Sequence, residues 1–269
     1  MRRVWALVAG AVLVLASAEA AKAAPPLGMA MAPHRATYHM SLDTTQPGSG
    51  IVGADGEMSY KFADTCDGYT VENRIAVTYA YSEGGQAQTS TDFVTWESKD
   101  GLRYRFRVRN ARNGEVTDEI EGTAELRGKG QGGVARFLRP QPMTVALPSG
   151  TLFPTDHTVR LMDAARAGQR SLLRVVFDGS DTDGPYDVNA LIGHPAPIQA
   201  NAASPLLDTP AWPMSLAFFP VSASDPAPDF EMRLDYHANG VAQDIIQVFK
   251  TFSLRGRLET IEALPRRHC

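Results

Sequence analysis

Four arginines alternate with apolar residues along one stretch of the chain, and this spacing is the clearest sign of binding chemistry. Residues 102–109 read LRYRFRVR, so a strand over this stretch would carry four guanidinium groups on one face: Arg103, Arg105, Arg107 and Arg109. Guanidinium groups hold phosphate and carboxylate groups through paired hydrogen bonds. The stripe is therefore a candidate site for an anionic ligand such as a lipid headgroup.

The same stripe also fits a solvated face of paired strands. If residues 110–114 form a hairpin loop, the antiparallel register places three arginines opposite glutamates: Arg109 opposite Glu115, Arg105 opposite Glu119 and Arg103 opposite Glu121. Exposed ion pairs of this kind add little stability. We favour ion pairing for this face and keep ligand binding as the alternative.

Aromatic residues alternate along the neighbouring predicted strands. They are Tyr60, Phe62, Tyr79, Tyr81, Phe93, Trp96, Tyr104 and Phe106. One sheet face lined in this way either fills itself or leaves a cavity for an apolar guest. A filled core is the simpler expectation. For a ligand site, Trp96 and Tyr79 are the aromatic candidates beside the arginines.

Groups for hydrolytic chemistry are present, but in no recognised arrangement. The chain has neither the G-x-S-x-G nor the Ser-x-x-Lys pattern of a serine nucleophile. Glu97, next to Trp96, would have a raised pKa if it were half-buried, but a hydrogen-bonded carboxylate at a strand end is the simpler interpretation. The protein is therefore predicted not to be an enzyme. The alternative is an envelope hydrolase, for which Glu97, Asp156 and His157 are the first candidates.

No metal, cofactor or nucleic acid is expected. The six histidines show no His-x-x-x-His spacing and no cysteine at zinc spacing. The run 178–184, DGSDTDG, suggests a calcium loop, but EF-hand spacing would require an acid at Gly179, so a polar turn is favoured. A formal net charge of -4 and a pI near 5.9 argue against a partner with a phosphate backbone.

The first residues predict export. Arg2 and Arg3 precede an uncharged apolar run over 4–16, and small residues follow, which is the pattern of a signal peptide cleaved after Ala23. No later stretch approaches 18 apolar residues, so the protein is not expected to span a membrane. The mature chain, 24–269, is predicted to be one periplasmic domain.

Two cysteines, Cys66 and Cys269, remain after cleavage. An oxidising compartment favours their pairing, and no Cys-x-x-Cys motif points to redox catalysis. A bridge would close a loop of about 200 residues, for which the chain-entropy model gives an upper value of about 5 kcal/mol. Two free thiols are the alternative.

Period-two alternation predicts a mainly β protein. The predicted strands are 35–42, 58–62, 69–81, 88–97, 102–108, 115–125, 134–139, 171–178, 186–192, 214–219, 229–237, 241–250 and 252–263. One helix is predicted between two groups of strands, capped by Thr155 or Asp156 and ended by Gly168. The stretch 195–213 shows no alternation and is predicted to be a loop. Strands at this spacing indicate a large antiparallel barrel, sandwich or coiled sheet.

Several longer blocks resemble the EipB family of alphaproteobacterial periplasmic proteins. They are PHRATYHMSL at 33–42, CDGYTVENR at 66–74, DFVTWESKDGLRYRF at 92–106, LPSGTLFPTDHT at 147–158, VFDGS at 176–180 and NGVAQDIIQVFKTFSLRGRLETIEALP at 239–265. The resemblance implies a spiral-like antiparallel sheet with a helix, similar to that of periplasmic lipoprotein carriers. It also implies a Cys66–Cys269 disulfide and a role in envelope integrity. The resemblance assigns no catalytic residues to this sequence.

The predicted function is therefore non-enzymatic support of the outer membrane through binding. The partner is either an envelope protein or a lipid-like guest. A purely structural module acting through an exposed strand edge is a further alternative to the hydrolase.

Overall fold

Two long meanders of antiparallel strands make up most of the protein. The structure is a computed structural model that describes residues 31–196, 198, 204–222 and 227–266. The predicted signal peptide 1–23 and Cys269 lie outside the described residues. The first meander consists of β1 (His34–Thr45), β2 (Ile51–Asp64), β3 (Gly68–Tyr81), β4 (Gln86–Ser98), β5 (Arg103–Arg112), β6 (Glu115–Leu126), β7 (Gly133–Arg139) and β8 (Met143–Leu147).

The second meander follows the helix α1 (Pro154–Arg166). Its strands are β9 (Ser171–Val176), β10 (Tyr186–Ile192), β11 (Ala211–Pro220), β12 (Phe230–His237), β13 (Ala242–Val248) and β14 (Phe252–Ala263). A short 3-10 helix, η1 (Pro205–Leu207), precedes β11. All strand pairs in this meander are antiparallel neighbours in the chain.

The first and last strands join the meanders into one sheet. β1 pairs with β14 along nearly its whole length, from His34 opposite Ala263 to Thr45 opposite Phe252. The resulting order of the 14-stranded sheet is β8-β7-β6-β5-β4-β3-β2-β1-β14-β13-β12-β11-β10-β9. β8 and β9 are its two edges, so the sheet stays open. The predicted large antiparallel sheet with one helix is confirmed.

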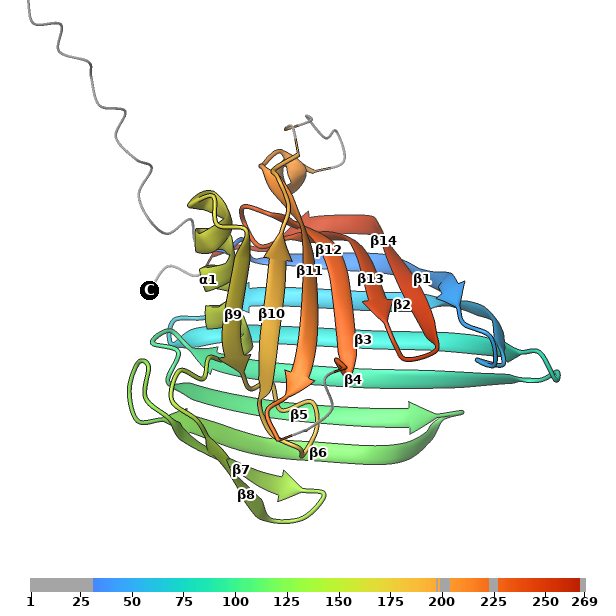
Figure 1. Ribbon diagram of the computed structural model, residues 1–269, viewed down its shortest axis with the longest axis horizontal. Coiled ribbons are helices and arrows are strands. Elements are labelled where there is room, and N and C mark those ends of the chain that lie inside the picture. The colour runs from blue at the N-terminus through green and yellow to red at the C-terminus, as the bar shows by residue number, and fades with distance from the viewer. Residues whose placement is uncertain (1–30, 197, 199–203, 223–226, 267–269) are drawn as a thin grey trace, which may run out of the picture.

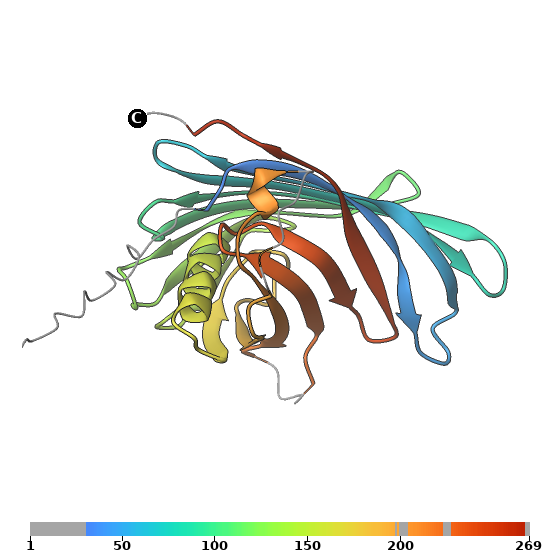
Figure 2. The same ribbon diagram turned by 90° about the horizontal axis from the view of Figure 1, so that it is seen from above.

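The sheet folds over on itself into two layers. β1–β8 form one layer, and β9–β13 cross in front of it at a steep angle (Figure 1). Seen from above, α1 lies beneath the first layer and beside β9 (Figure 2). The residues between the two layers are consequently shielded from solvent, while the opposite face of each layer is open to it.

Strand prediction succeeded where the alternation is long. One strand, β8, was missed because it has only five residues and lies between Pro142 and Pro148. The turn between β5 and β6 is a two-residue Asn113-Gly114 turn with φ of 52° and 84°. This conformation matches the twist of a tight hairpin and suits asparagine and glycine. The turn is therefore shorter than the predicted loop 110–114.

The helix begins without a capping side chain of its own. Its N-cap is Phe153, and Pro154 takes the first helical position. The prediction that Thr155 or Asp156 caps the helix is wrong, because both residues lie inside the first turn. The predicted end is confirmed: Gly168 has a φ of 74°, which closes the helix in the left-handed conformation.

Two apolar clusters fill the interior. The larger one lies between the layers and includes the buried Leu161 and Met162 of α1. The smaller one lies beneath β5–β8 and contains five aromatic rings, with Tyr104 stacked on Phe153 at 5.0 Å between ring centroids. Phe106 occupies space left by Gly179, where a Cβ atom would come within 2.5 Å of its ring. These rings fix the inner face of β5 against the chain beyond α1.

Candidate functional site

The predicted ligand residues lie on opposite faces of the first layer. Tyr79 faces inward and packs edge-on against Phe252, with ring centroids 5.6 Å apart. The four arginines face outward and are exposed, and Trp96 pairs with Arg105 on that same outer face. The expectation of one aromatic-lined face is wrong for Trp96. The structure therefore offers two candidate sites, one outside and one between the layers.

The outer face has a register different from the predicted one. The two-residue turn brings Arg109 opposite Glu119, Arg107 opposite Glu121 and Arg103 opposite Glu125, while Arg105 lies opposite Thr123. The predicted pairings of these arginines with Glu115, Glu119 and Glu121 are wrong in every case. The tighter turn and an irregularity between Asn110 and Ala111 account for the shift.

Part of this outer face is an ion-pair network centred on Glu119. Its carboxylate lies 3.8 Å from Arg107, 3.6 Å from Arg109, and in direct contact with Arg139 of β7. Arg139 also lies 3.9 Å from Glu121. Ion pairing, the favoured interpretation of the stripe, therefore holds for this part of the face.

One cross-strand row on the same face lacks a carboxylate. Arg105 of β5, Thr123 of β6 and Arg136 of β7 are direct neighbours, and all three are exposed. Within the described chain, neither arginine has a carboxylate within 4 Å. The guanidinium carbon of Arg105 lies 4.2 Å from the centroid of the Trp96 ring, which fits a cation–π contact.

A surface hollow of about 380 Å³ opens over this row. It is lined by Trp96, Arg103, Arg105 and Arg136, with the carboxylates of Asp67 and Glu125 at its sides. Three guanidinium groups and two carboxylates leave the hollow with one net positive charge.

The second candidate site is a cavity between the two layers. Its volume is about 140 Å³, and its lining includes Met58, Tyr60, Asn73, Met232, Leu234 and Tyr236. The Asn73 Oδ1 atom is buried and has no hydrogen-bond partner among the described residues. Tyr38 donates a hydrogen bond of 2.8 Å to the carbonyl oxygen of Ala242 at the cavity wall. The cavity is thus apolar, with a few polar groups at defined places.

The tyrosines of this cavity are held in their protonated form. Burial raises the pKa of Tyr38, Tyr60 and Tyr236, and the closeness of the three rings raises it further for Tyr38 and Tyr60. Their hydroxyl groups therefore remain able to donate hydrogen bonds at any physiological pH.

The three hydrolase candidates meet at the start of α1, in a structural arrangement. Glu97 is buried at the end of β4, and its two carboxylate oxygens accept the backbone N–H groups of Thr155 at 2.7 Å and Asp156 at 2.9 Å. Burial raises the pKa of Glu97 to about 7, against the lowering effect of these hydrogen bonds. Glu97 thus supplies the helix cap that the sequence around Phe153 lacks.

His157, in the first turn of α1, is also buried. Burial, with a smaller contribution from Arg174, lowers its pKa to about 4, so the imidazole is neutral at pH 7. Its Nε2 atom is buried with no hydrogen-bond partner among the described residues. Glu97 thus bonds the helix end through both of its oxygens, and among the described residues no hydrogen bond joins it to the His157 imidazole.

The DGSDTDG run forms a polar turn between β9 and β10, as favoured from the sequence. Asp178 accepts hydrogen bonds from the backbone and hydroxyl of Ser180, and Asp181 accepts them from the backbone of Asp183 and the Tyr186 hydroxyl. Among the described residues, no three His, Cys, Asp or Glu side chains gather closely enough to hold a metal ion.

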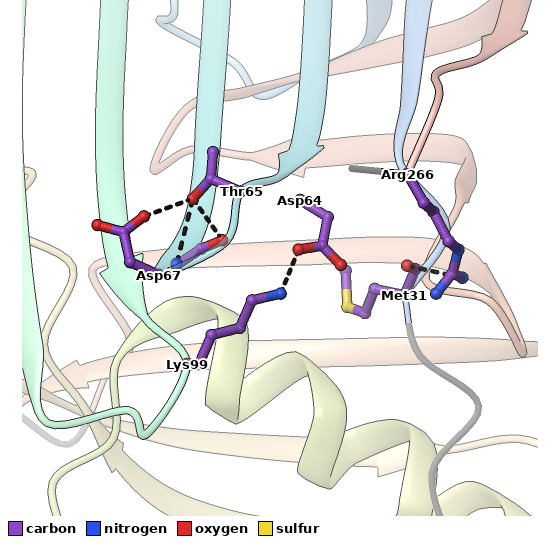
Figure 3. A network of polar contacts seen from close by, with 7 residues as sticks. Met31, Asp64, Thr65, Asp67, Lys99 and Arg266 are labelled. Carbon is purple, nitrogen blue, oxygen red and sulfur yellow. Dashed lines mark hydrogen bonds and ion pairs between the residues drawn. The ribbon is translucent and has the colours of Figure 1, made fainter. Parts of the chain in front are cut away.

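Cys66 lies in the turn between β2 and β3, where neighbouring side chains form several hydrogen bonds. Thr65 donates a hydrogen bond to Asp67 and accepts one from the Gly68 backbone, while Lys99 contacts Asp64 (Figure 3). At the same end of the sheet, Arg266 donates a hydrogen bond to the carbonyl oxygen of Met31 (Figure 3). Cys269 lies outside the described residues, so the Cys66–Cys269 bridge stays a prediction.

The described part of the chain contains no helix with the length and apolar character needed to cross a membrane. Its single α-helix has 13 residues and four charged side chains, Asp156, Arg160, Asp163 and Arg166.

The fold and its two candidate sites define a β protein with an open, folded-over sheet, a cavity between its layers and a hollow on its outer face. The model of the EipB-like family matches residues 26–265, and the chain belongs to this family. It is 29% identical over 267 residues to the cell envelope integrity protein EipB of Brucella abortus (strain 2308), covering 97% of this chain and 94% of that protein.

A solved structure shows the same fold. It is the crystal structure of a β-barrel-like protein, a domain of unknown function, from Brucella abortus. The TM-score is 0.81 at 28% sequence identity, and the match covers 88% of this chain and 99% of the other.

Proposed function

We propose that the protein supports cell-envelope integrity in the periplasm by binding an amphipathic, lipid-like guest between its two layers. The cavity lined by Met58, Tyr60, Asn73 and Tyr236 is the observation that carries this proposal. The name of the Brucella relative supports the envelope role. The proposed export through cleavage after Ala23 would bring the chain to that compartment.

The chemistry of the cavity fits a guest with an apolar part and a small polar group. Met58, Met232 and Leu234 offer apolar contacts, and methionine adapts to guests of irregular shape. The unpartnered oxygen of Asn73 would accept a hydrogen bond from a guest hydroxyl or amide. A cavity of about 140 Å³ is close to the roughly 150 Å³ that holds a benzene ring. This size suits the end of a lipid chain or one ring.

A protein partner is the second candidate. The outer face of β9 and β10 exposes two large apolar side chains, Leu173 at 58% and Leu191 at 59%. They lie on adjacent strands at one edge of the sheet. Exposed apolar residues near an open strand edge are typical of surfaces that another chain covers.

A non-enzymatic role is favoured over hydrolysis because of how Glu97 is used. Both of its oxygens bond the first turn of α1, and His157 beside it is neutral. A general acid or base must reach the proton of a bound substrate, and Glu97 is buried with both of its oxygens turned to the helix end.

Native mass spectrometry of the oxidised periplasmic protein tests the proposal. We expect extra mass that matches a lipid or fatty acid, and its loss in Ala242→Phe, which adds a ring at the cavity wall. Arg107→Gln, on the opposite face, is the matched control and should keep the guest. If Ala242→Phe is poorly folded, Asn73→Leu, which removes the polar group, should weaken retention of the guest.

Two outcomes would overturn the proposal. A bare wild-type chain that crosslinks to one periplasmic protein would move the function to the Leu173–Leu191 surface. Activity on an envelope substrate that Glu97→Gln abolishes would make the protein a hydrolase.

A further inference from the structure

We infer that Arg105, Thr123 and Arg136 form a binding site for a phosphate group on the outer face of the sheet. Trp96 and Arg103 complete it. This site is separate from the cavity between the layers and does not depend on a guest there.

Neighbouring rows of the same three strands differ in how their charges are compensated. Where β5 contributes Arg107 or Arg109, β6 contributes Glu121 or Glu119, and the charges are compensated. Where β5 contributes Arg105, β6 contributes Thr123. Two of these rows have an arginine on each side: the middle residue is the carboxylate Glu121 between Arg107 and Arg139, and it is the hydroxyl Thr123 between Arg105 and Arg136.

The spacing of this row suits an oxyanion. Adjacent strands lie about 4.8 Å apart, so the backbones of Arg105 and Arg136 are roughly 10 Å apart with Thr123 between them. Two arginine side chains can converge over that distance on one phosphate, and a threonine hydroxyl beneath it supplies a further donor. The Arg105 and Arg136 side chains are exposed and lie beside the hollow of about 380 Å³.

Trp96 pre-orders the cationic side of the site. Its ring lies 4.2 Å from the guanidinium carbon of Arg105 and 5.9 Å from that of Arg103. A guanidinium held over an indole loses less freedom when a ligand binds, so more of the contact energy appears as affinity.

The surroundings select the kind of anion. Asp67 and Glu125 flank the hollow, and Asp67 already accepts a hydrogen bond from Thr65. These carboxylates would repel a polyanion, and the net charge of the hollow matches one phosphate group. A phosphorylated soluble molecule and the headgroup of a phospholipid share this chemistry. The hollow is larger than a phosphate and has the indole at one side, so it has room for the group that carries the phosphate.

A charge-matched pair of double variants tests the site. Arg105→Gln with Arg136→Gln removes the proposed clamp, and Arg107→Gln with Arg139→Gln removes two arginines from the same strands, β5 and β7. The probes are glycerol phosphate in solution and vesicles of phosphatidylglycerol with phosphatidylcholine. Binding is followed by Trp fluorescence for the first probe and by vesicle flotation for the second.

We expect the clamp variant to lose affinity about tenfold, because two charge-assisted contacts disappear, while the control variant changes about twofold or less. Binding of glycerol phosphate alone would identify a soluble phosphate ester as the source, and binding of vesicles as well would identify a lipid headgroup. Equal losses in both double variants would mean attraction without a site. That result, or a wild-type protein that binds neither probe, would overturn the inference.

Discussion

The two faces of β4–β6 differ sharply: one is buried and tightly packed, and the other is exposed and charged. Facing inward, Glu97, Tyr104 and Phe106 are buried and held by a helix end and by stacked rings. Facing outward, one residue away, Trp96 and Arg105 lie at the surface beside an open hollow. The inner face consists of packed, buried side chains, and the outer face carries charged side chains that do not contact that packing. Changes inside should therefore alter stability, and changes outside should alter binding.

The largest expected effect is the loss of an inner ring. Phe106→Ala removes a side chain that contacts Phe137 and Phe177, and such truncations cost about 3–5 kcal/mol. We expect the melting temperature to fall by roughly 10 °C, measured by circular dichroism. Arg107→Ala, the next residue on the outer face, should change the free energy of unfolding by less than about 1 kcal/mol. Equal effects would remove the distinction between the faces.

A Cys66–Cys269 disulfide would make the stability of the sheet depend less on the packing of its inner face. If Cys66 and Cys269 are bonded, reduction or Cys269→Ser should lower stability by about 2–4 kcal/mol and the melting temperature by several degrees. The measurement is thermal unfolding with and without reductant. An unchanged melting temperature would show that no bridge contributes and that packing alone holds the sheet.

The pH dependence of stability reports on the inner face. Because the pKa of Glu97 is raised to about 7 in the folded protein, its contribution is full below the unfolded pKa near 4.5 and is lost as pH rises through 7. The advantage of the wild type over Glu97→Gln should therefore fall from pH 5 to pH 8, by an amount on the order of 3 kcal/mol.

His157 should produce the opposite trend. Its pKa is lowered to about 4, so its contribution is full above the unfolded pKa near 6.5 and is lost as pH falls through 4. Denaturant unfolding of the wild type and of Glu97→Gln at several pH values separates the two groups, because the variant keeps only the dependence that comes from His157. A flat difference for Glu97→Gln would mean that the carboxyl is not buried as described.

The smallest expected effect belongs to the outer ion pairs. Glu119→Gln weakens contacts with Arg107, Arg109 and Arg139, but all of them are solvated. We expect a loss of about 1 kcal/mol or less in chemical denaturation, shrinking further in high salt. A loss as large as that of Phe106→Ala would show that the outer face also holds the sheet together.

Local patterns in the sequence predicted most of the fold. Long alternating strands such as β3 and β5 are evident because each has a buried and an exposed side. The short β8 has too few residues for alternation to be recognised. Register was mispredicted because it depends on whether the turn has two residues or five, and Asn113-Gly114 was the signal for the shorter one.

The sites were harder to predict than the strands. Alternation tells which residues share a face but not which face is buried, and tryptophan can lie outside beneath an arginine, as Trp96 does. The cap of α1 comes from Glu97, 58 residues before Thr155. No pattern around residue 155 could reveal it, because the contact exists only after the strand and the helix have come together.

The seam between β1 and β14 sets the order in which the molecule can be completed. Thr37 and Thr260, which meet there, are 223 residues apart in the chain. Neighbouring strands within each meander can pair as soon as they are made, whereas a pairing this distant waits for nearly the whole chain. A chain that stops before Phe252 has two meanders and no strand to join them into one sheet. β14 is therefore the strand that completes the sheet. If the protein is exported starting from its N-terminus, the two meanders can join only after this strand has crossed the membrane.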